Sequence, residues 1–340
     1  MTGPNRLSSR AILLALALLL AACGSARSGD APLVLYSGQH PQTVSALVAA
    51  FTNATGIKVS VRSDDEGTLA NQILQESKRS PADLFYTENS PPLEALAEHG
   101  LLAPVDASTL AAVPSRYSSD TGDWVGVSAR AASFVYNTSK LAGAGAPSSV
   151  LDLAQPGWKG KLGLAPTESD FQPLVTAVAR LDGTAAATAW LTGLKANAQI
   201  YPDNESLVAA INNGQVAAGV INSYYWYRLR DEVGAAGMHS ALAPFAPGDP
   251  GNLVDVSGAA VLASSRERAA AQKFLAFLVG PQGQQIIATS ESYEYPIGSG
   301  ITTAKVTVPL SALRPPSVSV ADLGDGSAAL SLLQHVGLVD

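Results

Sequence analysis

The sequence predicts an α/β fold whose sheets are largely parallel. Short apolar runs typical of strands alternate with amphipathic segments typical of helices, and four strand-like runs along the chain are each followed by a polar segment. Hydrophobic residues make up 47% of the 340 residues and charged residues only 14%, so apolar side chains are plentiful enough for a core. A chain of this length has room for about two domains of roughly 100–200 residues each.

An apolar run near the N-terminus, residues 11–22, has the features of a secretory signal. Arg6 and Arg10 precede it, and the letters LAAC close it at Cys23, as in a lipobox. The run is too short to cross ~30 Å of hydrocarbon as a permanent helix. We therefore predict a signal peptide at 1–22, with a plain cleaved signal and a chance cysteine as the alternative. Removing 22 of the 340 residues leaves 318, and the loss of two arginines changes the net charge from −7 to −9.

Cys23 is the predicted lipid attachment point, with residues 23–31 as a small, polar, lipidated tether. Acylation there would anchor the protein to the outer face of the cytoplasmic membrane. Because it is the only cysteine, an internal disulfide and a Cys-rich zinc or iron–sulfur site are excluded. The acidic net charge argues against nucleic acid as a partner, since nucleic acid needs a basic face.

The first strand-like run is 33–36, followed by a turn at 37–40 and by Pro41, after which apolar residues recur with helical spacing. Proline at the first helical position predicts that the helix starts there. The second run is 82–86, followed by a turn at 87–90 and an amphipathic helix from Pro91 to His99, stopped by Gly100.

The third run is 161–165, which leads through a loop at 166–170 into a helix from Phe171. The fourth run, 216–221, is almost wholly apolar, and we expect a loop at 222–227 beyond it. Ligands of open α/β sheets bind beyond the carboxyl ends of the strands. The candidate positions are therefore the clusters that follow the four runs: His40, Glu88, residues 167–170 and residues 222–225.

The adjacent Tyr224 and Tyr225 point to metal chemistry. A phenol becomes a strong ligand only as phenolate, and a highly charged cation must drive down its ordinary pKa of ~10. Ferric iron is hard and trivalent, so it suits phenolate and carboxylate oxygens and tolerates one imidazole. Glu88 and the two phenolates would balance the charge of Fe(III), with His40 neutral. The alternatives are an aromatic packing cluster for the tyrosines and a capping or surface role for His40.

Several catalytic motifs are absent from the sequence. It has no G-x-S-x-G elbow, no H-E-x-x-H, no Walker loop and no G-x-G-x-x-G after a strand. A surface lipoprotein hydrolase would need an activated nucleophile, and the candidate clusters offer none in a recognisable elbow. A binding protein for an organic or anionic solute, whose tyrosines would stack or hydrogen-bond, stays open.

Three segments resemble the signature segments of bacterial periplasmic ferric-iron-binding proteins. They read LYSGQH at 35–40, SPADLFYTEN at 80–89 and INSYYW at 221–226, and further similarity lies at 50–59, 256–262 and 294–296. The resemblance is collinear and spans about residues 32–337. It implies a non-catalytic protein that binds Fe(III) through His40, Glu88, Tyr224 and Tyr225 and, as a monomer, delivers it to the permease of an ABC importer.

The resemblance also implies a two-lobed type II periplasmic-binding-protein fold, with the ligand cleft between lobes that close about a hinge. From the chain pattern, we expect one lobe at 32–130 plus about 252–302. The other lobe is then expected at 131–251 plus about 303–340.

One departure from that family concerns its synergistic anion, phosphate or carbonate. Two asparagines and small polar residues hold the anion in many members, and the matching positions here are Asn204, Asn222, Thr167, Ser169 and Asp170. A helix starting near Phe171 favours an anion, but the carboxylates of Glu168 and Asp170 would repel one. We therefore hypothesise that Asp170 or Glu168 takes the anion's place or leaves it to water. The alternative is Asp170 as an ordinary helix N-cap facing solvent.

Overall fold

The computed structural model describes residues 31–142, 147–298 and 300–340. The predicted signal peptide, Cys23 and most of the tether lie outside the described residues. Residues 33–340 form one compact unit. Within the described ranges, no helix combines the length and apolar character needed to cross a membrane.

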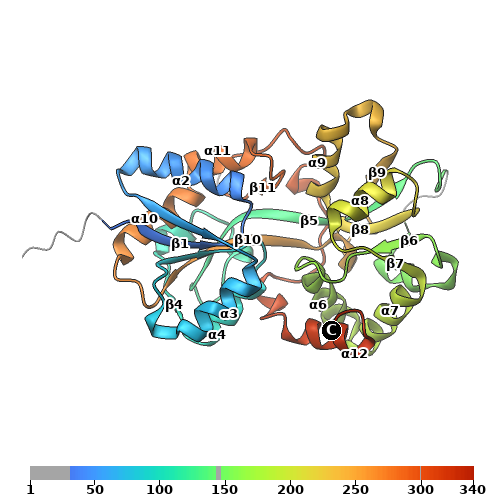
Figure 1. Cartoon of the computed structure of the whole chain (residues 1–340), viewed down its shortest axis with the longest axis horizontal. Coiled ribbons are helices and arrows are strands. Elements are labelled where there is room, and N and C mark those ends of the chain that lie inside the picture. Colours follow the sequence, from blue (N-terminus) through green and yellow to red (C-terminus); the bar gives the residue numbers. More distant parts are fainter. Residues whose placement is uncertain (1–30, 143–146, 299) are drawn as a thin grey trace, which may run out of the picture. The chain divides into compact units, whose positions relative to one another are not determined.

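One half of the unit is built on the parallel strands β1 and its neighbours. The sheet order is β2-β1-β3-β10, in which β10 is antiparallel to β3 and also pairs with the short β4. Helices cover both faces of this sheet (Figure 1). The elements are β1 (Leu33–Ser37), α2 (Pro41–Thr55), β2 (Val59–Ser63), α3 (Glu66–Glu76), β3 (Leu84–Tyr86), α4 (Pro91–Glu98), β4 (Leu102–Ala103), α5 (Ala107–Leu110), β10 (Val254–Leu262), α10 (Arg268–Val279), α11 (Pro281–Thr289) and β11 (Tyr295–Pro296).

The other half continues the sheet in the order β5-β8-β6-β7, with β9 paired to β5. Its elements are β5 (Val125–Asn137), β6 (Leu162–Leu164), α6 (Phe171–Asp182), α7 (Thr184–Asn197), β7 (Ala198–Ile200), α8 (Asn204–Asn212), β8 (Ala218–Asn222), α9 (Ser223–Val233), β9 (Ser240–Ala243) and α12 (Ser327–Val336). Short 3₁₀ helices lie at Ser77–Arg79, Ser115–Tyr117, Val150–Ala154, Pro156–Trp158, Ala235–Gly237, Pro250–Asn252, Leu310–Ala312 and Ala321–Leu323.

The long strand β5 joins the two halves. Its residues 125–131 pair with β10, and from Ala132 onward it pairs with β8 and β9 instead. Figure 1 shows β5 and β10 crossing between the halves. The fold is therefore the two-lobed α/β fold that the sequence predicts; we call the half that holds β1 lobe 1 and the half that holds β8 lobe 2. The exact lobe boundaries stay predictions.

Two expectations about the elements need correction. The sheets are mixed rather than largely parallel, because β5 and β10 run antiparallel to their neighbours as they pass between the lobes. The expected loop at 222–227 is the start of helix α9, which begins at Ser223 directly after β8. The predicted starts of α2 at Pro41, α4 at Pro91 and α6 at Phe171 are confirmed.

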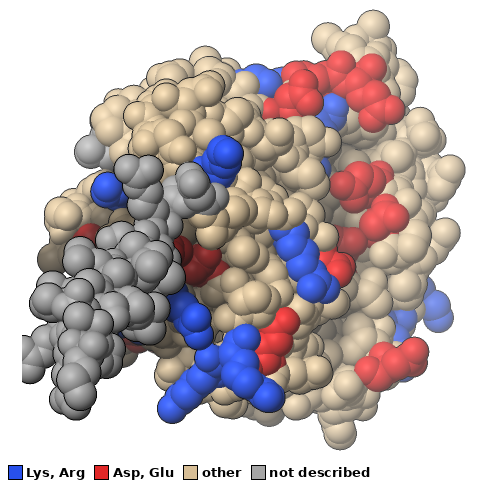
Figure 2. All heavy atoms as spheres, turned by 60° about the vertical axis from the view of Figure 1, so that its left-hand side comes forward, with Lys and Arg blue, Asp and Glu red and all other residues tan. Residues whose placement is uncertain are grey.

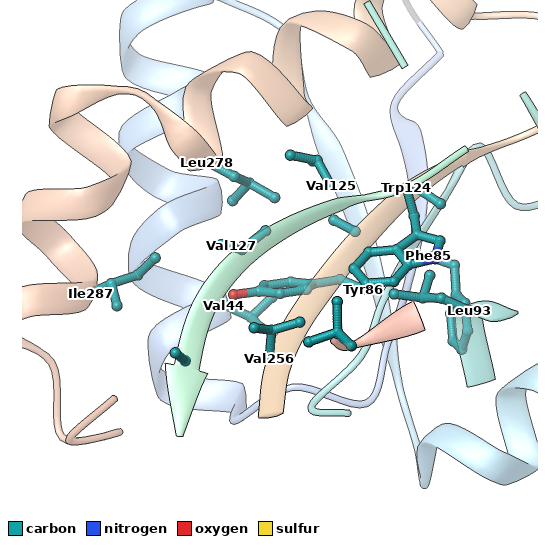
Figure 3. Packing of buried hydrophobic residues seen from close by; sticks show 14 of the residues in the cluster. Val44, Phe85, Tyr86, Leu93, Trp124, Val125, Val127, Val256, Leu278 and Ile287 are labelled. Carbon is teal, nitrogen blue, oxygen red and sulfur yellow. The ribbon is translucent and has the colours of Figure 1, made fainter. Parts of the chain in front are cut away.

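The core of lobe 1 fixes the strands that lead to the site. Figure 3 shows Tyr86 of β3 beside Val127 of β5 and Val256 of β10, and Phe85 on the side of Leu93 and Trp124. Truncating such buried apolar side chains costs about 2–5 kcal/mol, so the strand ends beyond them are held firmly. At the surface, acidic and basic side chains are interspersed over the face in Figure 2.

Candidate metal centre

His40 lies between the end of β1 and the first residue of α2. It is the N-cap residue of α2, yet its side chain makes no capping hydrogen bond. Its Nδ1 lies 2.6 Å from Oε1 of Glu88, which places the proton on Nδ1. Its Nε2 is buried and has no hydrogen-bond partner within the described chain. A carboxylate on one imidazole nitrogen and an unpartnered second nitrogen are typical of a metal-binding histidine.

Glu88 follows β3 and faces both His40 and a buried arginine. Its Oε2 accepts a hydrogen bond from Nη1 of Arg130 at 3.1 Å. Burial alone would raise the pKa of Glu88, but the charge of Arg130 and the hydrogen bond from His40 lower it to about 2. The group is therefore a carboxylate at neutral pH. Because a carboxylate has about four lone-pair positions, two remain after these contacts.

Tyr224 and Tyr225 lie in the first turn of α9, at the carboxyl end of β8. Their ring centroids are 4.0 Å apart, and the Tyr224 ring lies 5.3 Å from the imidazole of His40. Burial, and next the neighbouring phenol, raises the pKa of Tyr224 well above its ordinary value. Burial and the carboxylate of Asp170 do the same to the pKa of Tyr225. Without a cation both phenols are therefore neutral.

The four predicted metal-binding residues are thus brought together from two lobes, His40 and Glu88 from lobe 1 and the tyrosines from lobe 2. No group of three or more His, Cys, Asp or Glu residues suited to a metal occurs in the described ranges. The candidate centre contains only two residues of those types, since its other two ligands are phenols. A cavity of about 550 Å³ adjoins His40 and is lined also by Arg228 and Lys305.

Asp170 is held by Asn204 and Asn222, the two asparagines for which the sequence resemblance predicts a role in anion binding. Nδ2 of Asn204 donates to its Oδ1 at 3.0 Å, and Nδ2 of Asn222 donates to its Oδ2 at 2.9 Å. Asp170 is the N-cap residue of α6 but makes no capping hydrogen bond, so it does not act as an ordinary cap. Burial raises its pKa to about 6 even though Arg130 and Asn204 act against the shift.

The rest of the 167–170 loop is divided between the site and its surroundings. The phenol of Tyr225 donates to Oε2 of Glu168 at 3.3 Å, and burial, with Asp170 as the next cause, raises the pKa of Glu168 to about 7. Oγ of Ser169 accepts a hydrogen bond from Asn89 at 3.1 Å. Thr167 is exposed and donates to the carbonyl of Pro202, so its side chain does not join the cluster.

Sequence reasoning missed two buried charged residues beside the site. Arg130 of β5 contacts Glu88 and lies 5.3 Å from the ring centroid of Tyr224. Glu66, at the start of α3, accepts hydrogen bonds from the backbone amides of Glu88 at 2.7 Å and Asn89 at 3.0 Å. The available signal for Arg130 was that it is the single charged residue of β5. Glu66 has the pattern of an ordinary acid in the first turn of a helix.

A two-lobed α/β fold whose candidate ligands come from both lobes is the arrangement of a solute-binding protein. The chain belongs to the family described as bacterial extracellular solute-binding protein, whose model matches residues 46–307. It is 41% identical to the Fe(3+)-binding periplasmic protein of Serratia marcescens, over 96% of each chain. It is 39% identical to the major ferric iron-binding protein of Neisseria meningitidis serogroup B, over 95% of this chain and 98% of the relative.

Solved structures agree with these relatives. Iron-bound HitA from Pseudomonas aeruginosa superposes with a TM-score of 0.86 at 44% identity, covering 90% of this chain and 99% of HitA. The Trichodesmium protein IdiA (FutA), in complex with iron and citrate, superposes with a TM-score of 0.79 at 30% identity, covering 90% of this chain and 99% of that chain. The resemblance to ferric-iron-binding proteins is confirmed.

Proposed function

We propose that this protein is the substrate-binding component of an ABC importer for Fe(III). The observation that carries the proposal is the meeting of His40, Glu88, Tyr224 and Tyr225, with Nε2 of His40 buried and unpartnered among the described residues. The names of the relatives support the same cargo. In the proposed cycle, iron binds between two lobes. One lobe consists of residues 32–130 plus about 252–302, and the other of residues 131–251 plus about 303–340. The monomer then delivers it to the permease and performs no catalysis.

The chemistry of the four ligands suits a trivalent cation. Each buried phenol loses its proton only where a strong positive charge replaces it, which selects against monovalent and most divalent ions. Two phenolates and Glu88 supply three negative charges to Fe(III), and neutral His40 adds a nitrogen ligand.

The test is spectroscopic. Adding Fe(III) should produce a phenolate-to-iron charge-transfer band, and the double variant Tyr224→Phe with Tyr225→Phe should lack it. Tyr136→Phe, in β5 and stacked on Phe134, is the matched control and should keep the band. An unchanged spectrum in the double variant would refute the assignment.

We also propose that the Asp170 carboxylate takes the place of the synergistic anion. Its two oxygens already accept the amide hydrogens of Asn204 and Asn222. Iron affinity should therefore depend little on phosphate, whereas Asp170→Ser should vacate the position and make the affinity rise with phosphate. Thr167→Ser is the control, because that side chain lies outside the cluster. A steep phosphate dependence of the parent protein contradicts the proposal.

The proposed location is the outer face of the cytoplasmic membrane, with the lipid on Cys23. The periplasmic relatives support a position outside the cytoplasm. The lipobox letters LAAC support the anchor.

A further inference from the structure

Arg130 is buried at the point where β5 passes from one lobe to the other. Its side chain is 1% exposed, and the pairing of β5 changes from β10 to β8 between Ala131 and Ala132. A buried guanidinium needs partners for its donors and for its charge, because burial of an unpaired ion is very costly. The partners of Arg130 connect it directly to the candidate metal centre.

The guanidinium touches candidate ligands from both lobes. Nη1 donates to Oε2 of Glu88 at 3.1 Å, and Nη2 donates to Oγ of Ser257 at 3.1 Å and pairs with Glu294. Its central carbon lies 5.3 Å from the ring centroid of Tyr224, within cation–π distance. One rigid planar group therefore contacts a lobe 1 carboxylate and a lobe 2 phenol at once.

Glu294 anchors the guanidinium at Nη2, whereas Glu88 pairs with Nη1. Glu294 is itself 1% exposed, and it accepts hydrogen bonds from Ser128 at 2.7 Å and Gln39 at 3.2 Å. Ser257 also lies within 3.2 Å of it. The anchor is thus hydrogen-bonded through both oxygens and touches no candidate metal ligand, so it fixes Arg130 without taking part in the site.

Resting on the proposed function, we infer that Arg130 is a positioning residue for ferric iron. It holds the Glu88 carboxylate in the orientation in which Oε1 accepts the hydrogen bond from Nδ1 of His40. It also keeps a positive charge beside the Tyr224 ring. The orientation of His40 is set in turn, since its Nδ1 is bound to Oε1 and its Nε2 must face the metal. Lysine cannot replace Arg130, because a single ammonium cannot reach Glu88, Ser257 and Glu294 at once as the planar guanidinium does.

The experiment compares Arg130→Lys and Glu294→Gln with the parent in two measurements, the Fe(III) affinity by competition with citrate and the wavelength of the charge-transfer band. Arg130→Lys should lower the affinity about 10- to 100-fold, as loss of an outer-shell partner does, and should shift the band. Glu294→Gln should change both in the same direction by less. Arg180→Lys, on the exposed face of α6, should change neither.

A purely structural role would lower the thermal stability of the apo variants and leave the band of the folded, iron-loaded protein where it is. If Arg130→Lys does not fold, Glu294→Gln carries the test alone. If the affinity and the band are unchanged in the folded variants, the inference about Arg130 is overturned. The proposed function still stands in that case, provided that the parent protein shows the charge-transfer band. A parent without any charge-transfer band overturns the proposed function, and the inference about Arg130 with it.

Discussion

At the residue scale, the properties of the site depend on burial, which opposes the ionisation of its two phenols. The phenols of Tyr224 and Tyr225 are buried, and their pKa values are raised, so the empty site stores two protons on its oxygen ligands. Glu88 is the opposite case, because Arg130 and His40 keep it ionised. The site therefore carries little of its ligand charge until a trivalent ion arrives, and this selects for strongly charged cations.

This arrangement predicts that iron binding releases protons. Each raised phenol pKa means that the proton is bound before iron and lost after it, so the affinity should rise with pH, by about tenfold per pH unit for each proton displaced. For two phenols we expect about two protons per ferric ion, measured by pH-stat titration with ferric citrate. Equal release by the variant with both tyrosines changed to Phe would exclude the phenols as the source.

At the element scale, β5 carries the functional arginine and is also tightly packed near its start. At Gly126 an added Cβ would lie 2.0 Å from the carbonyl oxygen of Tyr117, closer than any real contact. The register against β10 also shifts between Ser257 and Gly258, opposite this part of β5. Added bulk at Gly126 would therefore push β5 and the 3₁₀ helix Ser115–Tyr117 apart, and β5 is the strand that carries Arg130.

Gly126→Ala should consequently lower the free energy of unfolding by about 1–3 kcal/mol, as overpacking does. Urea unfolding of the apo protein gives this value. Gly157→Ala is the control, because nothing lies within 4 Å of the position of its added Cβ. Equal stability of the two variants would mean that β5 and the 3₁₀ helix Ser115–Tyr117 can separate at no cost.

At the scale of the whole molecule, several contacts join the lobes around the centre. Asn89 of lobe 1 donates to Ser169 of lobe 2 at 3.1 Å, and Nε of Arg228 of lobe 2 donates to the carbonyl oxygen of Glu291 of lobe 1 at 3.2 Å. Asn89, which makes the first of these contacts, directly follows Glu88 in the chain. Iron release requires the lobes to part, so these contacts should contribute to the barrier for release.

Ser169→Ala removes one such contact and leaves the Asn89 amide with its other hydrogen bond, to Glu66 at 2.7 Å. Loss of a hydrogen bond worth about 1 kcal/mol should speed iron release about fivefold. Stopped-flow decay of the charge-transfer band after addition of a strong chelator measures the rate. Thr167→Ala, whose hydroxyl bonds within lobe 2, should leave the rate unchanged, and identical rates for both variants would contradict the role of the contact.

The order of the elements and the four candidate ligands could be read from local sequence. Strand, turn and helix patterns are short-range, and proline at the first helical position marks the starts of α2 and α4. These patterns place His40 and Glu88 at strand ends. The tyrosine pair could be recognised because two adjacent phenols suit a trivalent metal ion. The helical start at Ser223 was missed, because nothing in the residues beyond β8 distinguishes a loop from a helix.

The sequence by itself determined the two-lobed α/β class and the residues that suit a ferric ion, because both depend on local pattern, family resemblance and ligand chemistry. Only the tertiary structure decided that Asp170 lies between Asn204 and Asn222, and that Arg130 links Glu88 to Glu294. These contacts join residues up to 164 positions apart. Burial and ion pairing of that range depend on how the strands stack, which no short stretch of sequence specifies.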